Sequence, residues 1–217
     1  MRFNQDYKNA ALAALKGKWA PAVIASIIYV LIAFVCTGND TIGKLLHFQP
    51  GLLYTLTGAT LLITFFVYMP LTTGYGNAMR KNLDTGDYSF TSNMFGIALE
   101  GYLHKVWTLF LMEVKILLWA LLLIVPGIIK AYAYAMTPYI LVDHPEYSAR
   151  EAIAASEEMM KGHKFDLFWL YLSFIGWIFL AIITCGIGFF WLMPYLTTAQ
   201  AGFYNDLKGT DTIIVSE

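Results

Sequence analysis

Six long apolar stretches run through this chain of 217 residues, and they limit what it can fold into more than any other feature. A membrane-spanning helix needs about 20 mostly apolar residues, so six spans would use about 120. Hydrophobic residues make up 58% of the chain and charged ones 13%, against about 45–50% and about 25% in a typical soluble domain. The sequence therefore predicts an all-α membrane protein, a six-helix transmembrane bundle in a single domain, residues 1–217. The stretches cover residues 19–36, 52–73, 105–125, 127–142, 165–184 and 187–201.

The basic residues indicate how such a bundle is oriented. With the N-terminus inside, only Lys44 lies outside, and Lys115 and Lys130 lie within spans. The cytoplasmic segments, which also contain Glu157, hold the rest: Arg2, Lys8, Lys16, Lys18, Arg80, Lys81, Lys105, Arg150, Lys161, Lys164 and Lys208. Because cytoplasmic loops of membrane proteins carry an excess of Lys and Arg, we expect a multi-pass protein with both termini in the cytoplasm.

Three amphipathic segments each precede a pair of apolar stretches. Ser148 and Glu151 form a capping-box pattern at the start of the third segment. This order suggests three repeated units, residues 1–83, 90–143 and 147–208, each an interfacial helix followed by a two-span hairpin. Three unrelated hairpins under the same membrane constraints are the alternative. The apolar faces are Phe3, Tyr7, Ala10, Ala11, Ala14 and Leu15; Met94, Phe95, Ala98, Leu99 and Tyr102; and Ala149, Ala152, Ile153, Ser156, Met159 and Met160.

Glu113 and Lys115 are the most unusual residues because they lie inside the third stretch. An ionised group there costs at least about 2.5–3.5 kcal/mol on insertion scales. Two residues apart, they point to different sides of a helix and cannot simply neutralise each other. They either belong to a polar path or ion-coupled site, or Lys115 snorkels to the headgroups while Glu113 is protonated or bonded to a neighbouring helix.

Lys130 lies one turn inside the fourth stretch, close to the predicted outer face. Lys130, Tyr134 and Thr137 share one helical face by their spacing. A cation beside phenol and hydroxyl donors at headgroup depth could hold a lipid phosphate or another anion. Alternatively, Lys130 caps carbonyls freed at a Pro126-Gly127 turn or snorkels outward. Together with Glu113 and Lys115, these three residues form the candidate intramembrane ligand site.

Small residues four apart predict close helix packing. Gly74 and Ala78 are one such pair, and they allow two helix backbones to approach each other closely. The partner helix can belong to the same chain or to a second copy. The sequence leaves both open.

The sequence lacks the motifs that are typical of several classes of protein function. The chain has no phosphate loop, no HExxH and no nucleophile elbow, and its two cysteines cannot form a zinc site. Its net charge of −1 argues against nucleic-acid binding. We expect no cofactor and no metal, because the four histidines are scattered without ligand spacing: His47, His104, His144 and His163.

The second half of the chain resembles a known family. The motif from Pro126 to Tyr139 reads PGIIKAYAYAMTPY, and it is followed by SAREAI at Ser148, MMKGHK at Met159 and SFIGW at Ser173. Gly186-Ile-Gly188 and Pro194-Tyr195 complete the pattern. The chain is similar to the bacterial integral-membrane family called Domain of Unknown Function 975. The resemblance covers essentially the whole chain, most specifically residues 126–207. It implies a polytopic protein of the bacterial inner membrane and supplies no catalytic residues.

These observations favour a non-enzymatic protein of the bacterial cytoplasmic membrane. It would bind membrane lipids, other membrane proteins or a second copy of itself, in upkeep of the cell envelope. A small transporter or permeation pathway for an anionic or amphiphilic solute is the alternative. An enzyme with its site inside the bilayer is a third reading.

Overall fold

The computed structural model describes residues 3–37 and 63–214, and all regular elements in these ranges are helices, as the sequence predicts. Lys44 and the first half of the predicted second span, residues 52–62, lie outside the described residues. The elements are α1 (Asn4–Leu15), α2 (Trp19–Thr37), the π-helix η1 (Thr64–Tyr68), α5 (Met69–Thr85), α6 (Phe90–Leu99), α7 (Tyr102–Leu122), α8 (Ile124–Ala133), α9 (Thr137–Asp143), α10 (Ala149–Met159), α11 (Lys164–Leu172), α12 (Ile175–Ile183) and α13 (Phe189–Ile214).

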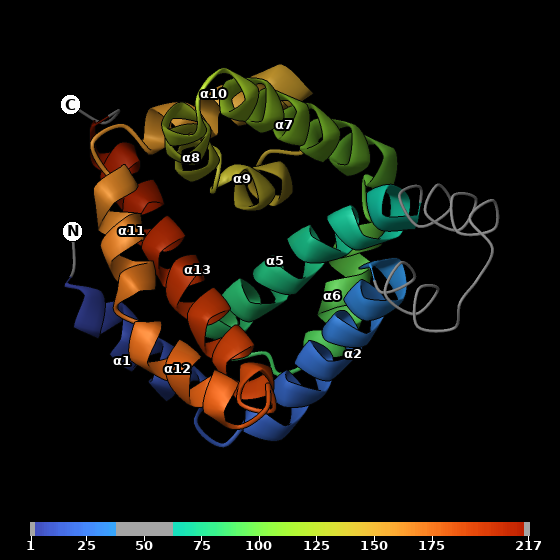
Figure 1. Cartoon of the computed structure of the whole chain (residues 1–217), viewed down its shortest axis with the longest axis vertical. Helices are drawn as coiled ribbons and strands as arrows, with labels where there is room; N and C mark the ends of the chain where they lie inside the picture. The colour runs from blue at the N-terminus through green and yellow to red at the C-terminus, as the bar shows by residue number, and fades with distance from the viewer. Residues whose placement is uncertain (1–2, 38–62, 215–217) are drawn as a thin grey trace.

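The helices form a ring whose middle is crossed by α5 and α13 (Figure 1). Helices α7, α8 and α10 make one side, α11 and α12 another, and α2 with α6 a third. Helix α13 packs against α1, α2 and α5, while α5 packs along α6. The core therefore lies around these two crossing helices, with side chains such as Tyr75, Met79 and Phe203 fully or almost fully buried.

The three amphipathic segments fold as α1, α6 and α10, which confirms that they are helices, although Tyr102 of the second segment instead begins α7 after a break at Gly101. The capping box is also confirmed, because the Glu151 carboxylate accepts a hydrogen bond from the Ser148 N–H at 2.7 Å. Each of these helices packs on a neighbouring predicted unit: α1 on α13, α6 on α2 and α5, and α10 on α7, α8 and α9. Their buried faces thus join the ring together.

The predicted fourth span, residues 127–142, is not one helix. Pro138 has no N–H to bond to the carbonyl of Tyr134, so α8 ends at Ala133 and α9 starts afresh at Thr137. At the usual 1.5 Å per residue, α8 is about 15 Å long, half of what a span requires. Sequence periodicity missed this break because apolar residues continue through it.

The hairpin turn before α8 also differs from the prediction. It falls at Leu123, whose backbone is extended, and not at Pro126-Gly127. Pro126 instead lies in the first turn of α8, where backbone N–H groups have no partner within the helix, so the N–H that proline lacks is not needed. Gly127 lets α8 approach α7, because a Cβ at this position would lie 2.7 Å from the Cβ of Ala120.

A serine of α10 satisfies the backbone at the break between α8 and α9. The Ser156 hydroxyl donates to the carbonyl of Ala133 at 2.9 Å and accepts from the N–H of Met136 at 3.2 Å. Buried backbone groups freed by a helix break need such partners, most of all in a membrane. Ser156 therefore holds the broken segment in place.

We expect Ser156→Val to destabilise the protein by about 1–3 kcal/mol, because it leaves the Ala133 carbonyl and the Met136 N–H buried without partners. Thermal unfolding of the purified protein in detergent measures this. Ala154→Val is the matched control, because Ala154 is exposed on the same helix. This substitution lowers only the helix propensity. Equal melting temperatures for the two variants would show that the serine does not hold the break.

Among the described residues, one helical segment is long and apolar enough to cross a membrane. This segment, Lys164–Ile183, comprises α11 and α12. A second candidate is the pair Asn4–Leu15 and Trp19–Phe34, which counts only if the two helices, bent by 102°, are taken as one span. Length and composition of the described helices thus support one or two crossings, fewer than the six that the sequence predicts.

Candidate ligand-binding cavity

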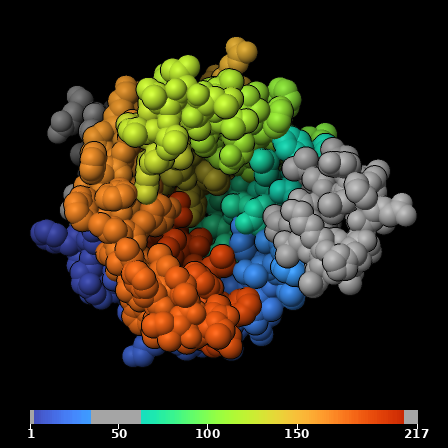
Figure 2. Space-filling view, viewed as in Figure 1, coloured from blue at the N-terminus to red at the C-terminus, as the bar shows by residue number. Residues whose placement is uncertain are grey.

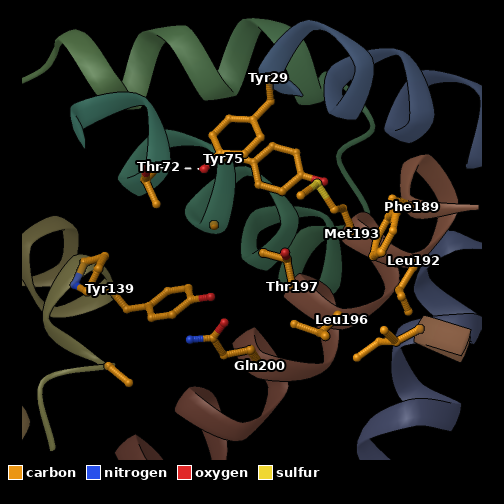
Figure 3. A pocket seen from close by; sticks show the side chains of 14 residues that line it. Tyr29, Thr72, Tyr75, Tyr139, Phe189, Leu192, Met193, Leu196, Thr197 and Gln200 are labelled. Carbon is orange, nitrogen blue, oxygen red and sulfur yellow. Dashed lines mark hydrogen bonds between the residues drawn. The ribbon is translucent and has the colours of Figure 1, made fainter. Parts of the chain in front are cut away.

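A cavity of about 340 Å³ lies between α2, α5, α9, α12 and α13. Figure 2 shows the hollow at the centre of one face of the molecule, with α13 at its floor. Figure 3 shows tyrosines on one side of the cavity and aliphatic side chains of α13, such as Leu192 and Leu196, on another. None of the described lining residues is Asp, Glu, Lys, Arg or His. The six polar residues that line it are Tyr29, Thr72, Tyr75, Tyr139, Thr197 and Gln200.

Two stacked tyrosines form one wall of the cavity. The rings of Tyr29 on α2 and Tyr75 on α5 lie 4.7 Å apart between centroids, at 17°. The Tyr75 hydroxyl is 2.7 Å from Oγ of Ser26, and the Tyr29 hydroxyl donates to the Tyr68 hydroxyl at 2.8 Å. Thr72 completes this group, with its Oγ1 3.3 Å from the Tyr29 hydroxyl. These bonds fix both rings, so the wall is preformed.

Tyr139 differs from these two because its hydroxyl has no hydrogen-bond partner among the described residues. The side chain is 3% exposed and lines the cavity. Its hydroxyl lies over the backbone of α5, 3.3 Å from where a Cβ on Gly76 would be. A buried hydroxyl normally has a partner. Together with the Gln200 amide, which lines the same cavity, Tyr139 offers hydrogen bonds to a bound molecule (Figure 3).

An ionic cluster lies directly behind Tyr139. The Tyr139 ring stacks on Tyr204 at 5.0 Å, and the Tyr204 hydroxyl donates to Asp143 at 2.8 Å. Arg80 donates to the same carboxylate, and Lys208 donates to it at 2.7 Å. Burial opposes ionisation of Asp143, but the hydrogen bonds from Arg80, Lys208 and Tyr204 outweigh it, so the pKa of Asp143 lies below its usual range. This cluster ties α5, α9 and α13 together at the base of the cavity.

Two of the five predicted site residues lie together, although away from the cavity. The Lys130 ammonium lies 5.7 Å from the ring centroid of Tyr134 and donates a hydrogen bond to Glu157 of α10. The charge pattern of the sequence places Lys130 near the outer face and Glu157 in the cytoplasm, whereas the structure joins them. The reason is that α10 packs on α7 and α8, which brings Glu157 next to Lys130.

The other three predicted residues are dispersed. Lys115 lies on the side of α7 that faces this pair, and its charge contributes to lowering the pKa of Glu157. Glu113 is exposed on a different side of α7. Thr137 is fully buried at the start of α9, and its hydroxyl has no partner among the described residues. None of the five lines the central cavity.

The sequence prediction of a site depends on charged residues inside apolar stretches, and the described lining of the cavity contains none. The signal that could have found it is uncharged: Tyr29, Tyr139 and Gln200 each interrupt an apolar stretch with a hydrogen-bonding side chain. Such residues in membrane helices usually face the protein interior. Which of these polar residues face the same cavity depends on how the helices cross. The crossing of the helices cannot be read directly from the sequence.

In the part of the chain that the structure describes, no three His, Cys, Asp or Glu side chains gather as a metal site would require. No curated protein and no solved structure matches the chain. A family model described as "Protein of unknown function (DUF975)" matches residues 121–211, from the end of α7 to α13. This region contains Tyr139, Gln200 and Lys130. The family resemblance of the sequence is therefore confirmed over residues 121–211, which match the DUF975 family model.

Proposed function

We propose that this chain is a multi-pass protein of the bacterial cytoplasmic membrane, with both termini in the cytoplasm, that binds an uncharged lipid-like amphiphile in its central cavity. Its role would be binding rather than catalysis. The observation that carries the proposal is the cavity itself, in which unpaired hydrogen-bonding groups lie on one side, alkyl side chains lie on another, and the described lining has no charge.

The outward surface supports a membrane location. Large apolar side chains are exposed along α7, α8, α11 and α12, among them Leu121 at 75%, Ile124 at 75% and Ile183 at 76%. Soluble monomers rarely expose contiguous apolar surface of this extent, whereas a bilayer covers it. The predicted six-span arrangement is part of this proposal except at α8, because the ion pair of Lys130 with Glu157 places α8 on the cytoplasmic side with α10.

The packing of the amphipathic helices supports three repeated units. Each of α1, α6 and α10 docks on a neighbouring unit, so that units 1–83, 90–143 and 147–208 would close a ring. In this arrangement the cavity lies among the units, since α2 and α5, α9, and α12 and α13 each contribute to its wall. Repeat proteins of membranes commonly bind their ligands at such an interface.

The size and lining of the cavity allow a specific probe. Monocaprylin has an uncharged glycerol ester and a single eight-carbon chain, so it matches a small cavity with polar and apolar sides. Native mass spectrometry of the protein in nanodiscs with added monocaprylin measures the bound fraction. We expect binding of monocaprylin and at least tenfold weaker binding of octanoate, whose carboxylate would be buried without a cation.

Variants of the cavity test the same proposal. We expect Tyr139→Phe with Gln200→Leu to weaken monocaprylin binding about tenfold, because about 1.4 kcal/mol of hydrogen bonding is lost. Tyr147→Phe is the matched control, since Tyr147 stacks on His144 away from the cavity. Unchanged affinity in the double variant, or preferential binding of octanoate, would contradict an uncharged amphiphile site.

Transport is the second candidate function, and one observation favours it. The segment after α8 contributes Ala135 and Pro138 to the cavity wall, so a broken helix borders the binding site. Transporters commonly place their substrates at such breaks. Flux of monocaprylin out of proteoliposomes, faster than from protein-free vesicles and slowed by Tyr139→Phe, would support transport. Binding without flux would limit the function to capture.

A further inference from the structure

A second site lies apart from the cavity, where α10 and α11 pack on α8. Lys130 of α8 donates a hydrogen bond to Glu157 of α10, and its ammonium lies 5.2 Å from the ring centroid of Trp119 on α7. Figure 1 shows α8 between α7 and α11. The ion pair is half-buried, so it is accessible from the surface of the molecule.

Two further lysines surround this pair. The hydrogen bond from Lys130 lowers the pKa of Glu157 most, and the charges of Lys164 and Lys115 lower it further. Lys115 is one helical turn before Trp119, so it lies on the same side of α7. The lysine cluster, defined as Lys115, Lys130 and Lys164, thus carries three positive charges against the one negative charge of Glu157. Its two uncompensated charges call for an anionic partner.

An apolar groove adjoins the lysine cluster. It has a volume of about 240 Å³ between α8 and α11, and Lys164 is part of its lining. Lys164 therefore belongs to both the groove and the cluster. The other residues that line the groove are Ile128, Ile129, Tyr132, Phe165 and Phe168.

We infer that the lysine cluster and this groove bind one anionic phospholipid, with its phosphate against Lys115 and Lys164 and an acyl chain along Ile129 and Phe168. The inference rests on the membrane location proposed above. The positive charge of the lysine cluster favours an anionic headgroup. The apolar lining of the groove favours a lipid with an acyl chain over free inorganic phosphate. Basic pockets between helices on the cytoplasmic side are typical sites for anionic lipids. Lys164 precedes the predicted fifth span on that side, so the site would draw from the cytoplasmic leaflet.

The test compares dioleoylphosphatidylglycerol with dioleoylphosphatidylcholine in mixed nanodiscs, using native mass spectrometry to count the lipids that the protein retains. We expect a preference for phosphatidylglycerol that Lys115→Gln with Lys164→Gln lowers about 25-fold, at about fivefold per lysine. Neither lysine makes a hydrogen bond with another side chain among the described residues, so this variant should fold. Arg150→Gln with Lys161→Gln is the matched control, because it removes two charges from the same side of the protein outside the cluster, and its preference should stay within about twofold.

Two more measurements separate the alternatives. Charge exchange by Lys130→Glu with Glu157→Lys keeps the ion pair and the net charge, and it should keep the preference. Monocaprylin binding in the Lys115→Gln/Lys164→Gln variant should be unchanged, so that failure of the lipid site is distinguishable from failure of the cavity. Equal retention of both phospholipids by the unaltered protein, or displacement of phosphatidylglycerol by millimolar inorganic phosphate, would overturn the inference.

Discussion

Asp143→Ala is expected to destabilise the protein by about 3–5 kcal/mol, because it removes the closer and more buried of the two carboxylates that pair with Arg80 and leaves only Asp84, at 3.8 Å. The Asp143 side chain is 10% exposed and that of Arg80 13%, so solvent replaces little of what is lost. One nitrogen of the Arg80 guanidinium already lacks a partner among the described residues. Asp143→Asn should cost nearly as much, since charge rather than volume is removed. Thermal unfolding in detergent measures both.

An exposed ion pair provides the control for this prediction. Glu158 in the last turn of α10 pairs with Lys161 just after the helix, where both side chains are mostly exposed. Glu158→Gln should therefore change stability by less than about 1 kcal/mol. If Asp143→Asn and Glu158→Gln have similar effects, the ionic cluster does not join α5, α9 and α13 as we describe.

The same cluster predicts how stability depends on pH. Because the folded protein lowers the pKa of Asp143, the unfolded chain binds the proton more readily. The stabilisation is then fully present above the ordinary carboxyl value of about 3.9 and is lost as the pH falls through the lower folded value. We expect the melting temperature of the unaltered protein to fall more steeply below about pH 4 than that of Asp143→Asn. Parallel curves would contradict this.

Local patterns in the sequence predicted the helices well. The amphipathic faces became α1, α6 and α10, and the Ser148 capping box formed as expected, because each depends on residues within one or two turns. The break after Ala133 was missed for the opposite reason. It needs Ser156, 23 residues further along the chain, to satisfy the backbone, and periodicity does not report such a partner.

The candidate sites depend on contacts even further apart in the chain. Tyr29 stacks on Tyr75, and Arg80 meets Asp143, across separations that no spacing rule covers. The sequence did single out Lys130 correctly as an unusual cation beside Tyr134. It could not predict the pairing with Glu157, since the predicted topology assigned the two residues to opposite sides of the membrane. The sequence therefore predicts which residues are chemically unusual, but not which residues they contact in the fold.

Gly74→Ala should lower stability by at least about 3 kcal/mol, one of the largest effects that a single methyl group can have in this protein. A Cβ on Gly74 would lie 2.0 Å from the carbonyl oxygen of Met94, so α5 and α6 would have to separate. Gly96→Ala is the matched control on α6, because a Cβ there meets nothing within 4 Å and should stabilise the helix by about 0.5–1 kcal/mol. Thermal unfolding should thus shift the two variants in opposite directions. The result also identifies which helix packs on the small-residue pair Gly74 and Ala78. A large loss of stability in the monomeric protein would show that α6 of the same chain packs on it. A loss of self-association with an unchanged melting temperature would show that a second copy packs on it.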